Sequence, residues 1–396
     1  MIRSNYLKQI EQGLLVHKVV ALLGPRQSGK TTLARMYAAL LQKEKGTTPE
    51  QITHFDLEDP TDIAALKNPK LVLRELSGLV IIDEIQRVPE LFPVLRVLVD
   101  LPDNRAHFLI LGSASRDLIR QSSESLAGRI AHIELTPFQL LETSTDKSER
   151  LWLRGGFPPS FLAKDNSISW QWRKEFIKSF LERDLPALGI GIPPQSLRRF
   201  WMMLAHYHGQ IVNFSELGRS FGASDSTIRR YLDLLNGTFM VRRLSSWHEN
   251  ISKRQVKAPK LYFRDSGLFH SLLGIENRDQ LNRHPKLGAS WEGFAIEEVI
   301  RCTNVTAEDC YFWATHTGAE IDLLTIQDGK KRGFEFKYSD HPKATKSMHA
   351  AMESLKLDSL TVISPTERSF PLSEKIRVVS LKDFVQSSRA EAQNRS

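Results

Sequence analysis

Short apolar runs alternate with longer helical stretches in the first third of the chain. Residues 19–23, 79–82 and 107–111 are predominantly apolar, and each run is followed by glycine or acidic residues. Runs of this length, bounded by turn residues, are typical of strands buried on both faces of a parallel sheet. A helical stretch at 32–41 follows the first run, and 130–135 is a further strand-like segment. The pattern predicts a doubly wound parallel α/β sheet over residues 1–145.

The middle of the chain, residues 146–250, has a predominantly helical pattern. Apolar residues at helical spacing over 151–205 predict a helical lid. Beyond it, we expect a helix at 213–221, a turn ending in the N-cap Ser224, and a second helix at 225–235. Ile228, Tyr231, Leu232 and Leu235 share one face of that second helix, and a strand-like stretch follows at 238–244. This order predicts a winged helix-turn-helix.

The last part of the chain, residues 251–385, predicts a smaller α/β domain. A helix is expected at 288–301, an alternating strand at 320–326, a turn at Asp328 and Gly329, and a paired strand at 333–337. Residues 386–396 are polar and lack periodicity, which predicts a disordered tail.

A phosphate-binding loop follows the first apolar run. Residues 24–32 complete the pattern G-x-x-x-x-G-K-T between a predicted strand and a predicted helix. Glycines let backbone N–H groups wrap the phosphates of ATP, Lys30 reaches the β- and γ-phosphates, and the Thr31 hydroxyl is placed to bind Mg²⁺. The candidate nucleotide-binding residues are Gly24, Pro25, Arg26, Gln27, Ser28, Gly29, Lys30, Thr31 and Thr32.

Two acidic residues follow the second apolar run, in the Walker B pattern. Asp83 is expected to hold Mg²⁺ together with Thr31, and Glu84 to polarise the attacking water. Ser113, after the third run, is a candidate sensor of the γ-phosphate, with an ordinary strand-end serine as the alternative. Arg129 is a candidate arginine finger, in cis or across a subunit boundary, with a surface arginine as the alternative. A finger acting in trans requires an oligomer, which the sequence does not establish.

Positive charge is concentrated in the middle of the chain. The net charge is +8, and residues 151–285 hold 20 Lys and Arg against 11 Asp and Glu. Such a localised field is expected of a protein that binds a phosphate backbone. The candidate DNA contacts are Arg229 and Arg230 on the second helix and Arg242 and Arg243 on the wing. The alternative is that this module docks a protein partner with an acidic face.

Composition narrows the class of protein further. The sequence is 41% hydrophobic and 25% charged, as in ordinary globular domains. No apolar run is long enough to cross a bilayer, and the first residues lack the pattern of a signal peptide. Cys302 and Cys310 fit no common metal motif and are expected to be reduced thiols. We therefore expect a cytoplasmic protein without a membrane partner.

A second group of chemically active residues lies near the C-terminus. The spacing D-x₁₂-E-x-K places Asp322 on one strand, and Glu335 with Lys337 on one face of the next. Two carboxylates at one edge can bind Mg²⁺, and a neighbouring lysine can orient water. With Glu292 from the preceding helix, these residues form a candidate nuclease site. A cross-strand salt bridge, or a nuclease-like fold without activity, is the alternative.

Six motifs together resemble a family of prokaryotic AAA+-like ATPases, and the resemblance covers roughly residues 1–385. It is carried by residues 24–32, 82–86, 112–115, 127–129, 155–158 and 181–184. The resemblance implies a further strand between the P-loop strand and the Walker B strand. The C-terminal half looks like the domain of unknown function that usually accompanies this ATPase and is similar to PD-(D/E)XK nucleases of the restriction-endonuclease-like fold. The resemblance implies ATP binding and, beyond that, DNA transactions.

The sequence therefore supports two hypotheses. In the first, the protein hydrolyses ATP with Mg²⁺ and couples hydrolysis to a DNA-binding, nuclease-like C-terminal half. In the second, it is an ATP-dependent regulatory switch of the STAND type, whose C-terminal half binds a protein partner and is inactive as a nuclease.

Overall fold

The computed structural model describes residues 1–113, 124–187, 192–248 and 258–394. Two compact units divide the chain between them. Unit 1 comprises Met1–Pro137 with Gly237–Phe239, and unit 2 comprises Phe138–Asn236 with Met240–Ser396. The helical region and the C-terminal region, expected as separate domains, therefore lie in one compact unit.

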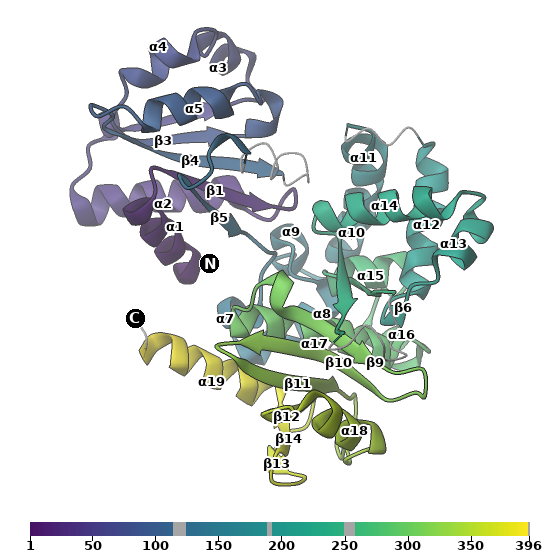
Figure 1. The fold of residues 1–396 in the computed structure, drawn as a ribbon. Helices are drawn as coiled ribbons and strands as arrows, with labels where there is room; N and C mark the ends of the chain where they lie inside the picture. The colour runs from purple at the N-terminus through teal and green to yellow at the C-terminus, as the bar shows by residue number, and fades with distance from the viewer. Residues whose placement is uncertain (114–123, 188–191, 249–257, 395–396) are drawn as a thin grey trace. The chain divides into compact units, whose positions relative to one another are not determined.

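Unit 1 is an α/β domain (Figure 1). Its strands are β1 Val19–Gly24, β2 Ile52–Asp56, β3 Gly78–Asp83, β4 Ala106–Ser113 and β5 Ile130–Glu134. Its described α-helices are α1 Ser4–Val16, α2 Lys30–Lys45, α3 Pro60–Ala65, α4 Pro69–Arg74 and α5 Leu91–Val99. Short 3-10 helices are found at Pro49–Gln51 and Ile85–Arg87.

The five strands form one parallel sheet in the order β2-β3-β4-β1-β5. This confirms the doubly wound parallel α/β fold. It also confirms that a further strand, β4, lies between the P-loop strand β1 and the Walker B strand β3. Because all strands are parallel, their carboxyl ends meet at one edge, where ligands of open α/β sheets bind.

Helices cover both faces of this sheet (Figure 1). Alternate residues of β1 point to opposite faces. Val20 and Leu22 share a buried cluster with residues of α1 and α2. Val19 and Ala21 share another with residues of α4 and α5. Burial on both faces explains why the strands read as continuous apolar runs.

Unit 2 joins a helical region to a large mixed sheet. Its first part contains α7 Leu140–Thr143, α8 Ser148–Arg154, α9 Pro158–Phe161, α10 Asn166–Ser179, a π-helix at Phe180–Asp184, α11 Leu185–Ala187, α12 Pro194–His206, β6 Gln210–Ile211, α13 Phe214–Phe221, α14 Asp225–Gly237, β7 Val241–Ser246 and β8 Lys260–Phe263. Its second part contains α15 Ser266–Leu272, α16 Arg278–Arg283, α17 Leu287–Thr303, β9 Cys310–Ala314, β10 Glu320–Gln327, β11 Lys330–Phe336, α18 Lys346–Leu355, β12 Ser359–Ser364, β13 Phe370–Pro371, β14 Ile376–Ser380 and α19 Leu381–Asn394. Further 3-10 turns lie at Thr145–Lys147 and Ala307–Asp309.

The helices predicted at 213–221 and 225–235 are present as α13 and α14. Asn213 caps α13, and Ser224 accepts a hydrogen bond from the Thr227 N–H at the start of α14. The four residues predicted to share one face of α14 are all buried: Ile228, Tyr231, Leu232 and Leu235. The hairpin β7–β8 follows, and β6 pairs with the other edge of β8.

The nine strands of unit 2 are connected in the order β13-β14-β12-β11-β10-β9-β7-β8-β6. A short parallel pairing of β7 with β9 joins the hairpin to the C-terminal strands. The sheet therefore continues across the boundary expected at residue 250. This continuity places residues of the β7–β8 hairpin beside residues of β10.

The predicted disordered tail is wrong for most of its length. Helix α19 runs through Asn394, and Leu381 and Val385 are buried in the cluster that contains α17. Their spacing of four residues places them on one face of the helix. Together with Phe384, which packs against the same cluster, this narrow stripe stabilises a segment that is otherwise largely polar.

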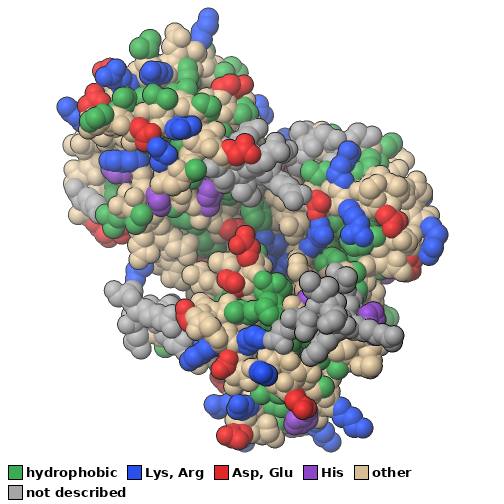
Figure 2. Space-filling view, in the orientation of Figure 1, with side chains coloured by type: hydrophobic (Ala, Val, Ile, Leu, Met, Phe, Trp, Pro, Cys, Tyr) green, Lys and Arg blue, Asp and Glu red, His purple; other side chains and the backbone are tan. Residues whose placement is uncertain are grey.

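A search of the described residues for a helix long and apolar enough to span a membrane finds none. On the face drawn in Figure 2, Lys and Arg side chains are interspersed with acidic and apolar ones.

Candidate functional site

The P-loop connects the carboxyl end of β1 to the amino end of α2. Gln27 and Gly29 have left-handed backbone angles, with φ of 61° and 96°. A turn of this kind, followed directly by a helix N-terminus, aims backbone N–H groups at one point. Gly24 has no room for a side chain, because a Cβ there would lie 2.2 Å from the Leu135 carbonyl oxygen.

Lys30 is buried inside this loop, with 5% of its surface exposed. Its Nζ donates to the carbonyl oxygens of Gly24 and Pro25, both at 3.1 Å. Burial lowers the pKa of Lys30, and the nearby carboxylates of Glu84 and Asp83 partly oppose that effect. The ammonium group is thus held at the loop, near Asp83 at the end of β3 and Glu84 directly after it.

The Walker B residues meet the P-loop as the sequence predicts. Thr31 Oγ1 donates to Asp83 Oδ2 at 2.6 Å, although 52 residues separate them in the chain. Hydroxyl and carboxylate oxygens are ligands that Mg²⁺ accepts. Thr31 and Asp83 are therefore a fitting pair to hold a Mg²⁺ ion next to the phosphates.

Glu84 turns away from the direction of β3. It has a left-handed backbone, with φ of 55°, and its carboxylate accepts a hydrogen bond from Gln86 Nε2. Non-glycine residues in this conformation cost roughly 1–3 kcal/mol and are concentrated at functional sites. The turn separates the side chains of Asp83 and Glu84, so that the two carboxylates can serve different roles.

A buried polar atom within the P-loop also fits a ligand. The Ser28 side chain is fully buried, and its Oγ has no hydrogen-bond partner among the described residues. Buried hydroxyls without a partner are uncommon in native proteins. The Ser28 carbonyl, in contrast, accepts from the Arg3 guanidinium at 3.2 Å, and the same guanidinium donates to the Thr136 carbonyl at 2.8 Å. Arg3 thereby ties the loop to the end of the domain, a role that sequence reasoning missed.

The candidate sensor and finger lie in different settings. Ser113 is half-buried at the end of β4, and β-sheet register places it opposite Gly24. Arg129 forms a two-point ion pair with Asp100, at 2.6 and 2.9 Å. The neighbouring Ala114 and Ser115 lie outside the described residues. Arg26 pairs with Glu58 at 3.8 Å, and Thr32 is exposed on α2.

The four candidate DNA contacts divide into two exposed residues and two that are engaged. Arg229 and Arg230 are exposed on α14, and the Arg229 guanidinium lies 3.7 Å from the centre of the Phe214 ring. Arg243 is paired with Asp233. Arg242 is buried and bonded to Glu297, so the expectation that it contacts DNA is wrong. Strand β7 directs it into the interior, where Glu297 also meets Arg264 and Arg301.

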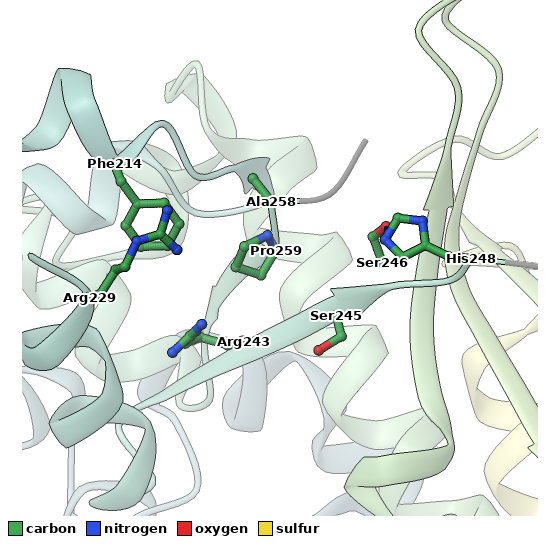
Figure 3. A pocket seen from close by; sticks show the side chains of 8 residues that line it. All are labelled: Phe214, Arg229, Arg243, Ser245, Ser246, His248, Ala258 and Pro259. Carbon is green, nitrogen blue, oxygen red and sulfur yellow. Dashed lines mark hydrogen bonds between the residues drawn. The ribbon is translucent and has the colours of Figure 1, made fainter. Parts of the chain in front are cut away.

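A cavity of about 550 Å³ lies between α13, α14 and the β7–β8 hairpin (Figure 3). It is lined by Phe214, Arg229, Arg243, Ser245, Ser246, His248, Ala258 and Pro259. Among the described residues that line it, the polar ones are basic or hydroxyl-bearing and none carries a carboxylate, which suits an anionic group.

The candidate nuclease residues are brought together at one end of β10 and β11. Leu323 pairs with Phe334, so Asp322 and Glu335 are neighbours on adjacent strands. Lys337 Nζ lies 2.7 Å from Glu335 Oε1, and Asp322 Oδ2 accepts from the Phe336 N–H at 3.1 Å. Glu292 joins them from α17, and its Oε1 accepts from the Tyr262 hydroxyl at 2.6 Å.

A further lysine, absent from the sequence-based site, lies among these carboxylates. Lys260 Nζ lies 3.1 Å from Asp322 Oδ1 and 3.6 Å from Glu292 Oε1, and it also pairs with Glu320. Burial raises the pKa of Glu292 to about 8 and of Glu335 to about 7, with the Asp322 charge as the next cause. No group of three or more metal-binding side chains with a geometry suited to a metal occurs among the described residues. The arrangement therefore does not fit a bound Mg²⁺ ion.

Three known domain families match consecutive parts of the chain. An AAA domain matches residues 16–144, the domain of unknown function DUF8612 matches 145–279, and the domain of unknown function DUF4143 matches 287–384. Among solved structures, a Walker-type ATPase of Pyrococcus abyssi is similar with a TM-score of 0.45 and 16% identity, over 68% of this chain and 95% of that chain. The ORC2 protein of Aeropyrum pernix is similar with a TM-score of 0.36 and 14% identity, over 69% and 92%. These structural similarities are too low to carry a functional inference.

Sequence relatives cover nearly the whole chain. An uncharacterised protein of Mycobacterium tuberculosis is 48% identical over 377 residues, which are 95% of this chain and 83% of the relative. An uncharacterised protein of Haemophilus influenzae is 26% identical over 71% of this chain and 76% of the relative. The chain thus belongs to the family of the mycobacterial protein, and it carries the P-loop ATPase domain of the AAA type at its N-terminal end.

Proposed function

We propose that this protein is a Mg²⁺-dependent ATPase whose nucleotide cycle controls DNA binding by unit 2. The observation that carries the ATPase proposal is the contact between Thr31 and Asp83, 2.6 Å apart and beside the buried Lys30. Two residues distant in sequence meet where a Mg²⁺–triphosphate requires oxygen ligands.

Each residue of the P-loop site has a separate task in this proposal. Backbone N–H groups of residues 24–32 bind the phosphates, and Lys30 exchanges its two carbonyl partners for phosphate oxygens. Thr31 and Asp83 hold Mg²⁺, which when bound neutralises charge on the phosphates. Glu84, oriented by Gln86, accepts a proton from the attacking water. Ser113 contacts the γ-phosphate from the end of β4.

Arg129 can act as an arginine finger only if its ion pair with Asp100 breaks. The two-point ion pair holds the guanidinium in one orientation. Both side chains are partly exposed, so the pair is worth little and can exchange for a phosphate at low cost.

The DNA-binding part of the proposal is supported by unit 2. Two capped helices followed by a hairpin have the order of a winged helix-turn-helix, and the excess positive charge lies in this part of the chain. Arg229 and Arg230 are exposed on the second helix, and Arg229 lines the basic cavity of Figure 3. The proposal stops at DNA binding and does not extend to cleavage, because Lys260 engages the carboxylates of the candidate nuclease site.

The test is the ATPase rate with and without duplex, branched and single-stranded DNA, combined with DNA affinity at several salt concentrations. We expect DNA to change the rate, and affinity to fall steeply with salt, since binding to phosphates releases counterions. Replacing both Arg229 and Arg230 by alanine is expected to weaken binding and reduce the salt dependence, whereas Arg278→Ala, distant from α14 in sequence, serves as the control. An unchanged ATPase rate together with absent or salt-independent binding would reject DNA and favour the regulatory switch with a protein partner.

A further inference from the structure

The acidic centre of unit 2 contains a cation supplied by the chain itself. Lys260 is the first residue of β8, and only 3% of its surface is exposed. Its Nζ contacts three carboxylates from two elements, namely Glu292 of α17 and Glu320 and Asp322 of β10. A buried lysine is found in such a place only when its charge is paired.

The carboxylate oxygens at this centre are largely committed. Asp322 uses Oδ1 for Lys260 and Oδ2 for the Phe336 N–H. Glu292 Oε1 accepts from the Tyr262 hydroxyl, and Glu335 Oε1 pairs with Lys337. A Mg²⁺ or Mn²⁺ ion requires several oxygen ligands at about 2.0–2.2 Å in near-octahedral geometry. The ammonium group of Lys260 and a divalent ion would therefore compete for the same oxygens, at a separation where their charges repel strongly.

One carboxylate oxygen of the centre makes none of these contacts. Glu335 is buried, and its Oε2 has no hydrogen-bond partner among the residues described. This oxygen belongs to the strand beside Asp322, where an added ion would gain it as a ligand. The acidic centre thus has the oxygens of a metal site but already contains a positive charge.

We propose that the Lys260 ammonium group takes the place of a divalent metal ion in this centre, and that it holds α17, β8 and β10 together as an internal ionic contact. In the folded protein the centre is metal-free, and its carboxylates are structural. Glu292, Glu320, Asp322 and Glu335 do not form a metal-binding group as they stand. Without the Lys260 charge, these four side chains rearrange around one divalent ion. This inference is independent of ATP hydrolysis, since all of these residues belong to unit 2.

The test is Mn²⁺ binding to the full-length protein without nucleotide, measured by calorimetry and by the electron paramagnetic resonance signal of free Mn²⁺. We compare wild type, Lys260→Met, Asp322→Asn, and the double variant Lys260→Met with Asp322→Asn. Methionine keeps much of the length and apolar character of the lysine stem and removes its charge. Any Mn²⁺ bound at the P-loop of unit 1 is common to the four proteins and cancels in the comparison.

We expect Lys260→Met to bind one more Mn²⁺ per chain than wild type, and the double variant to lose that site or weaken it about tenfold or more. Circular dichroism establishes that each variant is folded. If wild type binds Mn²⁺ in a manner that Asp322→Asn abolishes, or if Lys260→Met is folded and gains no site, the proposal is overturned.

If Lys260→Met fails to fold, the proposal is tested by comparing Mn²⁺ binding to wild type and to Asp322→Asn. Equal Mn²⁺ binding by these two supports a metal-free centre, because removing a central carboxylate would then remove no metal. Loss of a bound Mn²⁺ in Asp322→Asn would contradict it.

Discussion

At the scale of single residues, the nucleotide site is built from groups that sequence spacing could place. The strand and helix around the P-loop fix the position of Lys30, and the parallel sheet brings Asp83 to Thr31. The partners that hold these groups were not predictable in the same way. Gln86 orients Glu84, and Arg3 bonds the Ser28 carbonyl, through contacts that follow no motif spacing.

Replacing Lys30 by methionine is expected to weaken binding of Mg²⁺–ATP by about 10–100-fold, because charge-assisted hydrogen bonds to the phosphates are worth roughly 1.5–3 kcal/mol. The measurement is ATP affinity by calorimetry. Arg35→Met, an exposed change in the same helix, is the matched control and is expected to bind like wild type. Equal affinity of Lys30→Met and wild type would remove the lysine from the phosphate site.

At the scale of elements, backbone conformation and close contacts explain why two glycines, Gly155 and Gly156, follow helix α8. Gly155 has a left-handed backbone with φ of 75°, and the Gly156 N–H donates to Asp265 Oδ2 at 2.7 Å. Asp265 also caps α15 through the Leu268 N–H at 2.8 Å. One buried carboxylate therefore connects the turn after α8 to the start of α15. The motif contributes to packing within unit 2.

Gly156→Ala is expected to destabilise unit 2 by about 1–3 kcal/mol or more, as overpacking does. Its Cβ would lie 2.2 Å from the Phe138 carbonyl oxygen, so the backbone would have to move. Gly288→Ala is the matched control, because a Cβ at this position of α17 meets nothing within 4 Å. Alanine is favoured over glycine in helices, so the control should be neutral or slightly more stable. Urea unfolding measures both variants, and equal free energies of unfolding would contradict the packing role of Gly156.

The elements themselves could largely be predicted from the sequence, and the failures have a common cause. Strands β1, β3 and β4 read as apolar runs because both faces of their sheet are covered. Helix α14 was visible in its buried stripe. Helix α19 was missed because its few buried residues pack against distant α17, and Arg242 was misplaced because its partner Glu297 lies 55 residues away. Local patterns do not contain such long-range contacts.

At the scale of the whole molecule, unit 2 is expected to lose stability in acid because it buries two neutral histidines. His208 accepts from the Phe263 N–H through Nδ1 at 3.0 Å, so its Nε2 donates to the Ala289 carbonyl. His270 donates through Nδ1 to the Leu153 carbonyl and accepts from the Ser290 hydroxyl. Burial lowers the pKa of each histidine to about 3, because the charged imidazolium would lose its hydration in the interior.

The sign of the pH effect follows from these pKa values. Between about pH 3 and 6.5, the two histidines are protonated in the unfolded chain but stay neutral in the folded protein. The free energy of unfolding therefore falls as pH falls, by roughly 1.4 kcal/mol per pH unit for each histidine. Glu292 and Glu335, whose pKa values are raised, have the opposite effect: at pH above the usual pKa of a glutamate, they increase the stability as pH falls. Urea unfolding from pH 7 to 4 is therefore compared between wild type and His270→Gln. The variant should show the weaker pH dependence, and parallel curves would contradict the neutral buried histidine.

The acidic centre shows what the sequence cannot predict at this scale. Spacing along β10 and β11 brought Asp322, Glu335 and Lys337 together correctly. Lys260 lies 62 residues before Asp322, on a strand that the continuous nine-stranded sheet brings near β10. Sequence spacing predicts the cluster of carboxylates but not the Lys260 ammonium group that pairs with them. The role of the centre therefore depends on tertiary structure.

The most direct test of the account is ATP hydrolysis by Glu84→Gln compared with wild type, with Mg²⁺–ATP affinity measured on the same preparations. Glutamine retains the size of the side chain and its hydrogen-bonding capacity towards Gln86, but it cannot accept the proton of the attacking water. We predict that hydrolysis falls by about 10²–10⁴-fold while ATP affinity stays close to that of wild type. Hydrolysis at the wild-type rate in a folded, ATP-binding Glu84→Gln protein would contradict the assignment of the catalytic base.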